Sequence, residues 1–192
     1  MMNGCPRWSY LTVPLLAALG CSDPVPRPPQ GNLTLSVQHA STGSPTCPVP
    51  GKTYVVGNPK GPNSADAGNR FIDGENGATI KCAVTGGGPF NFSGNIKALS
   101  GTSDFVTMTI TNGVIAADKL NGTATIAINT PQLAATFTSP PGMCTLTVVG
   151  GNVKPGSVWA TAYCPSVTDT STGKACSIGT TTTFVFENCE GS

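Results

Sequence analysis

Apolar and polar residues alternate along most of the chain after residue 31. In 33–37, 80–84 and 106–111, apolar side chains occupy every second position and mostly polar residues fill the positions between them. An alternation of period two predicts a β-strand with one buried face and one face in solvent. The same pattern recurs, more weakly in the last three, at 90–98, 123–129, 144–148, 157–163, 180–186, 53–56, 113–117 and 134–138. The chain therefore predicts about eight to ten short strands and no long helix.

Clusters of glycine, proline and asparagine separate these segments and predict the turns between them. They are Gly-Gly-Gly at 86–88, Thr-Asn-Gly at 111–113, Asn-Gly at 121–122, Ser-Pro-Pro-Gly at 139–142 and Gly-Gly-Asn at 150–152. Gly94 lies inside a strand pattern, where a glycine indicates a β-bulge or bend. Many short strands with one apolar face each predict an all-β domain, an antiparallel β-sandwich with a β-barrel as the alternative.

The composition supports a folded domain and excludes one class of partner. Only 10% of the 192 residues are charged, but 26 are threonine, many of them next to aliphatic residues. Abundant β-branched residues favour a strand-rich fold over disorder. The ten basic residues are scattered and the formal net charge is +1, so we expect no nucleic-acid partner. Residues 32–192 suffice for one domain with its own core.

The first twenty residues have the features of an export signal. Arg7 supplies a positive start, and an apolar stretch too short to span a bilayer follows it up to Gly20. The sequence Ala18-Leu19-Gly20-Cys21 resembles the lipobox of bacterial lipoproteins. The resemblance implies cleavage before Cys21, acylation of that cysteine and a membrane anchor. An ordinary signal peptide is the alternative, because Ala18-Leu19-Gly20 also fits a soluble-export cleavage site.

We expect residues 21–31 to comprise the lipidated Cys21 followed by a proline-rich tether. Four prolines in ten residues predict an extended, semi-rigid spacer between a membrane and the domain. In lipoproteins of bacteria with two membranes, Asp directly after the cysteine favours retention at the inner membrane. Ser22 occupies that position here, so the resemblance implies a location in the cell envelope at the outer membrane.

The number of cysteines supports the interpretation of the chain as a lipoprotein. Cys5 leaves with the signal and Cys21 carries lipid, so six remain, enough for three disulfides in an oxidising compartment. No Cys-x-x-Cys pair is present, which disfavours zinc. The six are Cys47, Cys82, Cys144, Cys164, Cys176 and Cys189.

A hairpin of 157–163 and 180–186 would place two of these cysteines at one end of its connecting loop. Cys164–Cys176 is therefore the first expected pair, followed by Cys47–Cys82 and Cys144–Cys189.

Three groups of residues are candidate sites. Trp159 and Tyr163 share one face of their strand and could form an aromatic ligand platform, although core packing is the more common role. Asp66, Asp73 and Glu75 are oxygen donors in one loop and make a weak calcium candidate, because their spacing matches no known calcium loop. The single histidine, His39, has no partner motif, so we expect no catalytic residues, no metal and no cofactor.

The sequence favours a non-enzymatic binding, adhesive or structural module at the cell envelope, with an unknown protein or carbohydrate partner. The alternatives are a small-molecule or carbohydrate-binding lipoprotein and a secreted hydrolase. The segments Trp159-Ala-Thr-Ala-Tyr-Cys-Pro and Phe184-Val-Phe-Glu-Asn-Cys189 resemble uncharacterised exported bacterial lipoproteins. That resemblance implies an exported lipoprotein and no particular activity.

Overall fold

The computed structural model describes residues 25–40, 47–49, 51–57, 70–101 and 104–191. Eleven strands and one short 3-10 turn, η1 (Glu75–Gly77), make up the described chain. The strands are β1 (Gln30–His39), β2 (Lys52–Val56), β3 (Phe71–Ile72), β4 (Thr79–Gly86), β5 (Phe90–Ser100), β6 (Asp104–Ile115), β7 (Asn121–Asn129), β8 (Phe137–Thr138), β9 (Cys144–Lys154), β10 (Ser157–Thr168) and β11 (Ala175–Glu187). Among these residues, no helix is long and apolar enough to cross a membrane.

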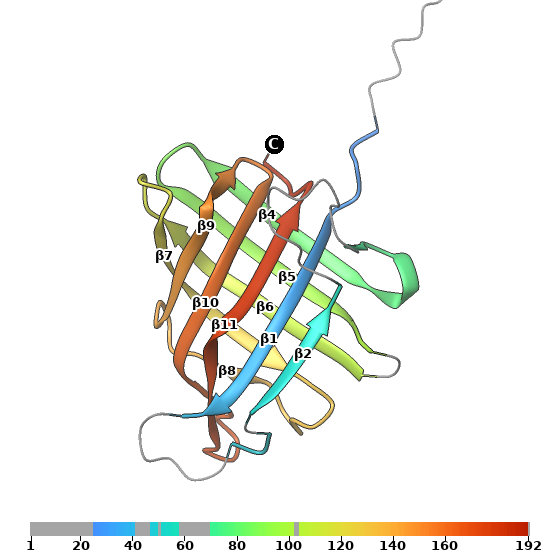
Figure 1. Ribbon diagram of the computed structural model, residues 1–192, viewed down its shortest axis with the longest axis vertical. Helices are drawn as coiled ribbons and strands as arrows, with labels where there is room; N and C mark the ends of the chain where they lie inside the picture. Colours follow the sequence, from blue (N-terminus) through green and yellow to red (C-terminus); the bar gives the residue numbers. More distant parts are fainter. Residues whose placement is uncertain (1–24, 41–46, 50, 58–69, 102–103, 192) are drawn as a thin grey trace, which may run out of the picture.

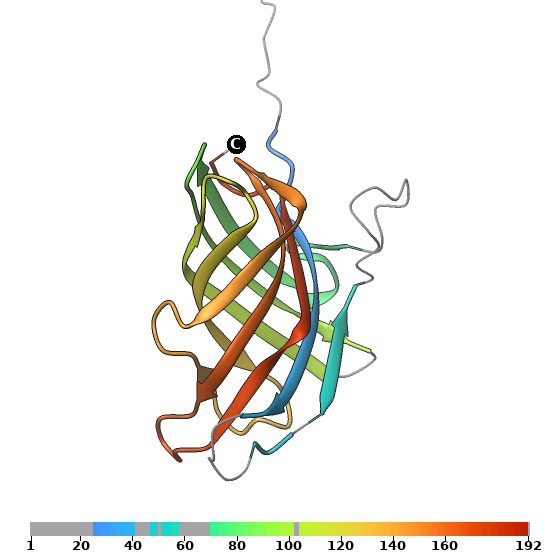
Figure 2. The ribbon, with the colours of Figure 1, turned by 60° about the vertical axis from the view of Figure 1, so that its left-hand side comes forward.

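All the strands belong to one antiparallel sheet, which folds back on itself. Its order is β2-β1-β11-β10-β8-β7-β6-β5-β4, with β9 inserted between β10 and β7 and β3 paired to β1. β9, β10, β11, β1 and β2 form one layer, and β7, β6, β5 and β4 cross behind them (Figures 1 and 2). The predicted all-β antiparallel fold is confirmed, in a form that is both sandwich-like and barrel-like.

The core fills the space between the two layers. Every second residue of β5 is buried, as the alternating pattern predicts, and the same holds for β6 and β7. Phe184 lies at the centre, with its ring centroid 6.1 Å from that of Phe92 and 5.8 Å from that of Phe186. Aromatic rings at these separations add to the burial of apolar area in holding the layers together.

Two predicted turns and the bulge at Gly94 are confirmed. Gly-Gly-Gly at 86–88 connects β4 to β5, and Ser-Pro-Pro-Gly at 139–142 connects β8 to β9. The pairing of β5 with β6 shifts register between Phe92 and Gly94. A side chain at position 94 would enter the Phe186 ring, since an added Cβ would lie 2.4 Å from it.

Three other predicted turns are wrong. Thr-Asn-Gly at 111–113 lies inside β6 as a bulge, with Asn112 at φ 50°, so the separate strand expected at 113–117 is the end of β6. Asn121 and Gly122 begin β7, and Gly-Gly-Asn at 150–152 lies inside β9. Asn112, Gly150 and Gly151 have positive φ angles, which suit bulges as well as turns, so these residue types do not distinguish the two.

Both edges of the sheet are covered by local contacts. The segment after β11 adds a parallel bridge between Glu190 and Ala83 of β4, and the Asp73 carboxylate accepts the Ile80 N–H at 2.8 Å. On the other edge, the Val55 N–H of β2 donates to Ser100 Oγ at 3.0 Å. Such contacts satisfy backbone groups that an open edge would expose.

All six cysteines of the domain form disulfides, as expected, but the expected pairing is wrong. The bonds are Cys47–Cys176, Cys82–Cys189 and Cys144–Cys164. Three disulfides are typical of an exported protein outside the cytoplasm.

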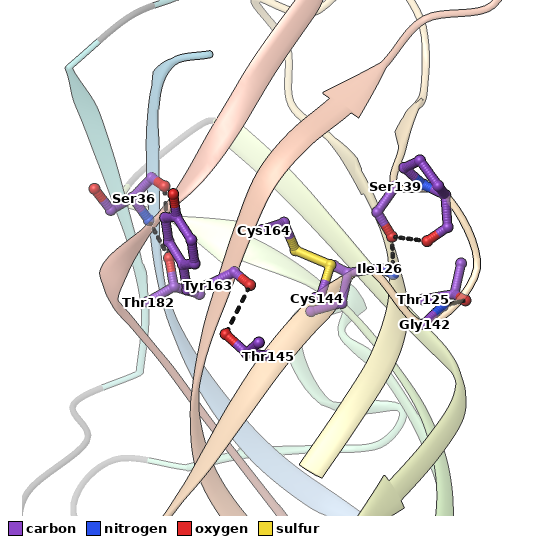
Figure 3. Close-up of a disulfide and its surroundings, with 11 residues drawn as sticks. Ser36, Thr125, Ile126, Ser139, Gly142, Cys144, Thr145, Tyr163, Cys164 and Thr182 are labelled. Atoms are coloured by element: carbon purple, nitrogen blue, oxygen red, sulfur yellow. Dashed lines mark hydrogen bonds between the residues drawn. A yellow bond between two sulfur atoms is a disulfide. The ribbon is translucent and has the colours of Figure 1, made fainter. Parts of the chain in front are cut away.

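The error in pairing comes from the length of the β10–β11 hairpin. The hairpin exists, but both strands extend beyond the alternating segments, so only 169–174 connect them. Cys164 therefore lies within β10 opposite Ile178, while Cys176 lies opposite Val167. Cys164 is instead bonded to Cys144 on the neighbouring strand β9, with 4.3 Å between the Cα atoms (Figure 3).

Candidate functional site

A cleft lies at the end of the domain where the tether enters. We call it the proximal cleft. It has a volume of about 930 Å³, within the range of small-ligand sites. The tether and the C-terminal segment lie together at this end, opposite the β10–β11 turn (Figure 1). The cleft is lined by Pro26, Arg27, Pro29, Gln30, Lys154, Pro155, Ser157, Glu187, Asn188, Cys189, Glu190 and Gly191.

The tether forms one wall of the proximal cleft because its last residues are bonded to the domain. Asn188 Nδ2 donates to the Pro28 carbonyl at 3.2 Å, and the Asp73 N–H donates to the Pro29 carbonyl at 2.9 Å. Gln30 Nε2 then donates to the Glu187 carboxylate at 2.7 Å, where β1 begins to pair with β11. Proline has no N–H to donate, so its carbonyl is its only backbone bonding group.

The opposite wall is the tight turn between β9 and β10. Gly156, at φ 78°, makes this turn possible, since that conformation is unfavourable for other residues. Its N–H donates to the Val84 carbonyl at 3.0 Å, and its carbonyl accepts the Cys189 N–H at 2.9 Å. The turn, β4 and the C-terminal segment therefore form one hydrogen-bonded unit.

Charges of both signs line the proximal cleft. Glu187 is already neutralised, because Arg70 Nη2 lies 3.0 Å from its carboxylate. Arg27, Lys154 and Glu190 are exposed, and none forms an ion pair with another described residue. The cleft thus offers two cations and one carboxylate that are not engaged within the described structure.

A row of three buried side chains, two of which carry polar atoms, lies next to this cleft on the outer face of the sheet. Trp159, Val185 and Asn32 stand side by side on β10, β11 and β1, one row beyond Glu187 and Gln30. Trp159 is 7% exposed and Asn32 is 1% exposed. Trp159 Nε1 and Asn32 Oδ1 are buried without a hydrogen-bond partner in the described structure, which is uncommon for buried polar atoms.

Trp159 and Tyr163 lie on one face of β10, as predicted, but they are buried to different extents. Trp159 is buried, as expected, but it lies outside the main core cluster that contains its neighbours Val158 and Ala160. Little of its ring is open for stacking. Tyr163 is on the same outer face and half-buried, and its carbonyl accepts a hydrogen bond from the Thr145 hydroxyl (Figure 3).

The remaining candidates are scattered. Asp66 and Cys21 lie outside the described residues, Asp73 holds the edge of β4, and Glu75 is exposed on η1. No three His, Cys, Asp or Glu residues of the described chain lie close enough together to hold a metal ion. His39 is exposed at the end of β1, and its carbonyl accepts the Ser177 hydroxyl at 2.7 Å.

One buried acid was not identified from the sequence. Asp169 is 5% exposed at the β10–β11 turn, and its carboxylate accepts hydrogen bonds from the hydroxyls of Thr172 and Ser171 and from the Ser171 N–H. These bonds, Thr172 foremost, lower the pKa of Asp169. The sequence Asp-Thr-Ser-Thr-Gly is a recognisable turn of this kind, in which an Asp side chain bonds the backbone two residues on.

Comparison of the chain with family models, with curated proteins and with solved structures finds no match. The fold defines the chain as a disulfide-bonded all-β domain, and its three disulfides are consistent with an exported protein. The proximal cleft is lined by both polar and apolar groups and is formed partly by the chain's own tether.

Proposed function

We propose that this chain is a lipoprotein, anchored through Cys21, whose all-β domain is a non-enzymatic binding module of the cell envelope. The observation that carries the proposal is the attachment of the tether. Pro28 and Pro29 are bonded to the domain, so the segment after Cys21 leads directly into one end of it. An anchored domain held in this way has a defined orientation, with the β10–β11 turn facing away from the membrane.

The rest of the domain fits a rigid scaffold. Three disulfides and a continuous sheet fix the positions of the connecting loops, and loops on rigid scaffolds are frequent binding surfaces. The hydrogen bonds of Asp169 to Ser171 and Thr172 restrain the β10–β11 turn, and restraint of a loop before binding reduces the entropy lost on binding a partner. Its exposed residues, 170–174, supply hydroxyls and one lysine for such a contact.

Cell fractionation tests the anchor. The unaltered chain should sediment with membranes and lose this association when Cys21→Ala removes the acylation site, because stable anchoring requires acyl chains on that residue. Mass spectrometry of the purified chain should show an acylated Cys21 at the N-terminus. An unmodified Cys21 in a chain released without detergent would contradict the proposal.

Recognition of a small carbohydrate is the second candidate. It is favoured by the unpartnered Trp159 Nε1 and Asn32 Oδ1, since a sugar hydroxyl can accept from the first and donate to the second. The row lies next to the proximal cleft, which has room for a sugar ring, but both atoms are buried in this structure, so this contact requires a local opening of the row. A change in Trp159 fluorescence on titration with monosaccharides would support this candidate over a protein partner.

A secreted hydrolase is the weakest of the three functions. Such an enzyme brings titratable groups with perturbed pKa values together in a cleft. Within the described residues, Asp169 is the acid whose pKa is lowered, and it lies at the β10–β11 turn, far from the cleft. Its carboxylate is fully engaged by its own turn.

A further inference from the structure

The tether leaves little distance between the anchor and the domain. Pro26 already lines the proximal cleft, and it follows Cys21 by five residues. Five residues span at most about 18 Å even when fully extended. If Cys21 carries the acyl chains, as proposed above, the proximal cleft lies within about 18 Å of the acylated residue, within reach of the headgroups of that bilayer.

The groups in the cleft match one class of molecule found at that surface. Arg27 and Lys154 can each donate to a phosphate, and Glu190 can accept hydrogen bonds from a primary ammonium group. A purely anionic headgroup would be repelled by the Glu190 carboxylate. A purely cationic headgroup would be repelled by Arg27 and Lys154. A zwitterion satisfies both signs.

We propose that the proximal cleft binds the phosphoethanolamine headgroup of phospholipids in the anchor's own membrane. The phosphate lies against Arg27 and Lys154, and the ammonium lies against Glu190. The contact supplements the acyl anchor and fixes the rotation of the domain relative to the membrane. The choice of a lipid rests on the proposed anchor, while the match of charges rests on the cleft alone.

A headgroup titration tests the site without requiring the anchor. The probe is soluble glycerophosphoethanolamine, added to the ¹⁵N-labelled chain that starts at position 21 with Cys21→Ser, which keeps every residue described in the structure. We expect amide shifts at Lys154, Ser157, Asn188 and Glu190. Lys154→Ala and Glu190→Gln should each weaken binding by about fivefold, the effect of one exposed charge contact.

Matched controls remove the same charges elsewhere. Lys174→Ala takes an exposed lysine from the β10–β11 turn, and Glu75→Gln takes an exposed carboxylate from η1, so neither should alter the titration. Glycerophosphocholine, whose ammonium has no N–H, should bind more weakly than glycerophosphoethanolamine. Inorganic phosphate should shift fewer of these amides.

Three results would overturn the headgroup proposal. One is the absence of shifts at the cleft, the second is equal binding of the choline and ethanolamine probes, and the third is a phosphate response identical to that of glycerophosphoethanolamine. The anchor fails separately, through an unmodified Cys21. A positive titration together with an unmodified Cys21 would support the headgroup site and contradict the acyl anchor.

Discussion

Cys82 and Cys189 are bonded across the seam of the folded sheet. Cys82 lies on β4, the last strand in the sheet order, whereas Cys189 lies two residues beyond the end of β11. Beside the bond, the Val84 N–H donates to the Glu190 carbonyl at 3.0 Å. The bond therefore joins the back layer to the segment that also contacts the tether, and it closes the proximal end of the domain.

We expect loss of this bond to be costly. The two cysteines are 107 residues apart, and a disulfide that closes a long loop restricts the unfolded chain strongly. The double variant Cys82→Ala/Cys189→Ala should lose about 5 kcal/mol of unfolding free energy in the chain-entropy model, against about 3 kcal/mol for a 20-residue loop, both measured by urea denaturation without reductant. Cys144→Ala/Cys164→Ala is the control, because that bond is equally buried but spans only 20 residues. A larger loss in the control would contradict the loop-entropy explanation.

Thr182 completes a hydrogen-bond ladder that the backbone leaves incomplete. Between Thr34 and Val37, β1 is paired to a β11 segment that is two residues longer, so Ser36 has no regular partner on β11, although it pairs with Thr53 of β2 on its other side. The Thr182 hydroxyl accepts the Ser36 N–H at 3.0 Å and lies 3.5 Å from the Ser36 carbonyl (Figure 3). Both residues are buried, so water does not replace the bond.

Thr182→Val should therefore lower the free energy of unfolding by about 1–3 kcal/mol, because it keeps the shape and leaves a buried N–H without a partner. Thr183→Val, at the half-buried next position of the same strand, should change it by less than about 0.5 kcal/mol. Chemical denaturation of both variants measures the difference. Equal effects would show that Ser36 finds another partner.

The strands were predictable because alternation is a local property. Each strongly alternating segment became a strand, and Gly94 was correctly placed at a bulge. The disulfide pairing was not predictable, because it depends on which strands are neighbours in the sheet. Cys144 meets Cys164 only because β9 pairs with β10.

The candidate site, like the disulfide pairing, depends on which segments are neighbours in the fold and so could not be predicted in full. Alternation placed Trp159 on the face opposite Ala160, but it did not show that both faces of the front layer are partly buried. The proximal cleft combines the tether, the turn at Gly156 and the C-terminal segment, which are far apart in the sequence. Its residues carry no shared motif, so only the fold brings Arg27, Lys154 and Glu190 together.

The Asp169 turn should make the free energy of unfolding depend on pH in the acidic range. Its hydrogen bonds lower the pKa of Asp169 in the folded state below the ordinary value of 3.8. A lowered folded pKa stabilises the protein above the unfolded pKa, and this contribution is lost as the pH falls through the folded value. Asp169→Asn should therefore be less stable than the unaltered protein at pH 7, and the difference should shrink by pH 2.

Thermal unfolding of both proteins across this pH range measures the effect. Asp118→Asn is the matched control, since Asp118 is an exposed acid in another turn and, among the described residues, accepts a hydrogen bond from the Leu120 N–H alone. A constant difference between Asp169→Asn and the unaltered protein at all pH values would show that the turn needs the side-chain shape and not its charge.

Gly94 should tolerate no side chain. An added Cβ would lie 2.4 Å from Phe186, whose ring is fully buried in the core. Gly94→Ala should therefore cost about 1–3 kcal/mol of unfolding free energy through forced repacking. Gly87→Ala is the control, because an added Cβ there meets nothing within 4 Å and the backbone conformation suits other residues. Loss of stability in Gly94→Ala alone would locate the constraint at the Phe186 contact, and equal losses would refute it.

Trp159 offers a direct optical test of the row beside the proximal cleft. The chain has two tryptophans, and Trp8 lies within the predicted signal, so the exported chain should contain only Trp159. At 7% exposure, its emission should be blue-shifted and resist quenching by acrylamide, in contrast to the same chain in urea. Asn32→Ala, on β1 of the same row, should leave the emission blue-shifted, because it removes an unpartnered carbonyl and not a contact of the core. Red emission that is quenched as readily as in urea would show an exposed indole, and it would favour the aromatic ligand platform over a packed outer face.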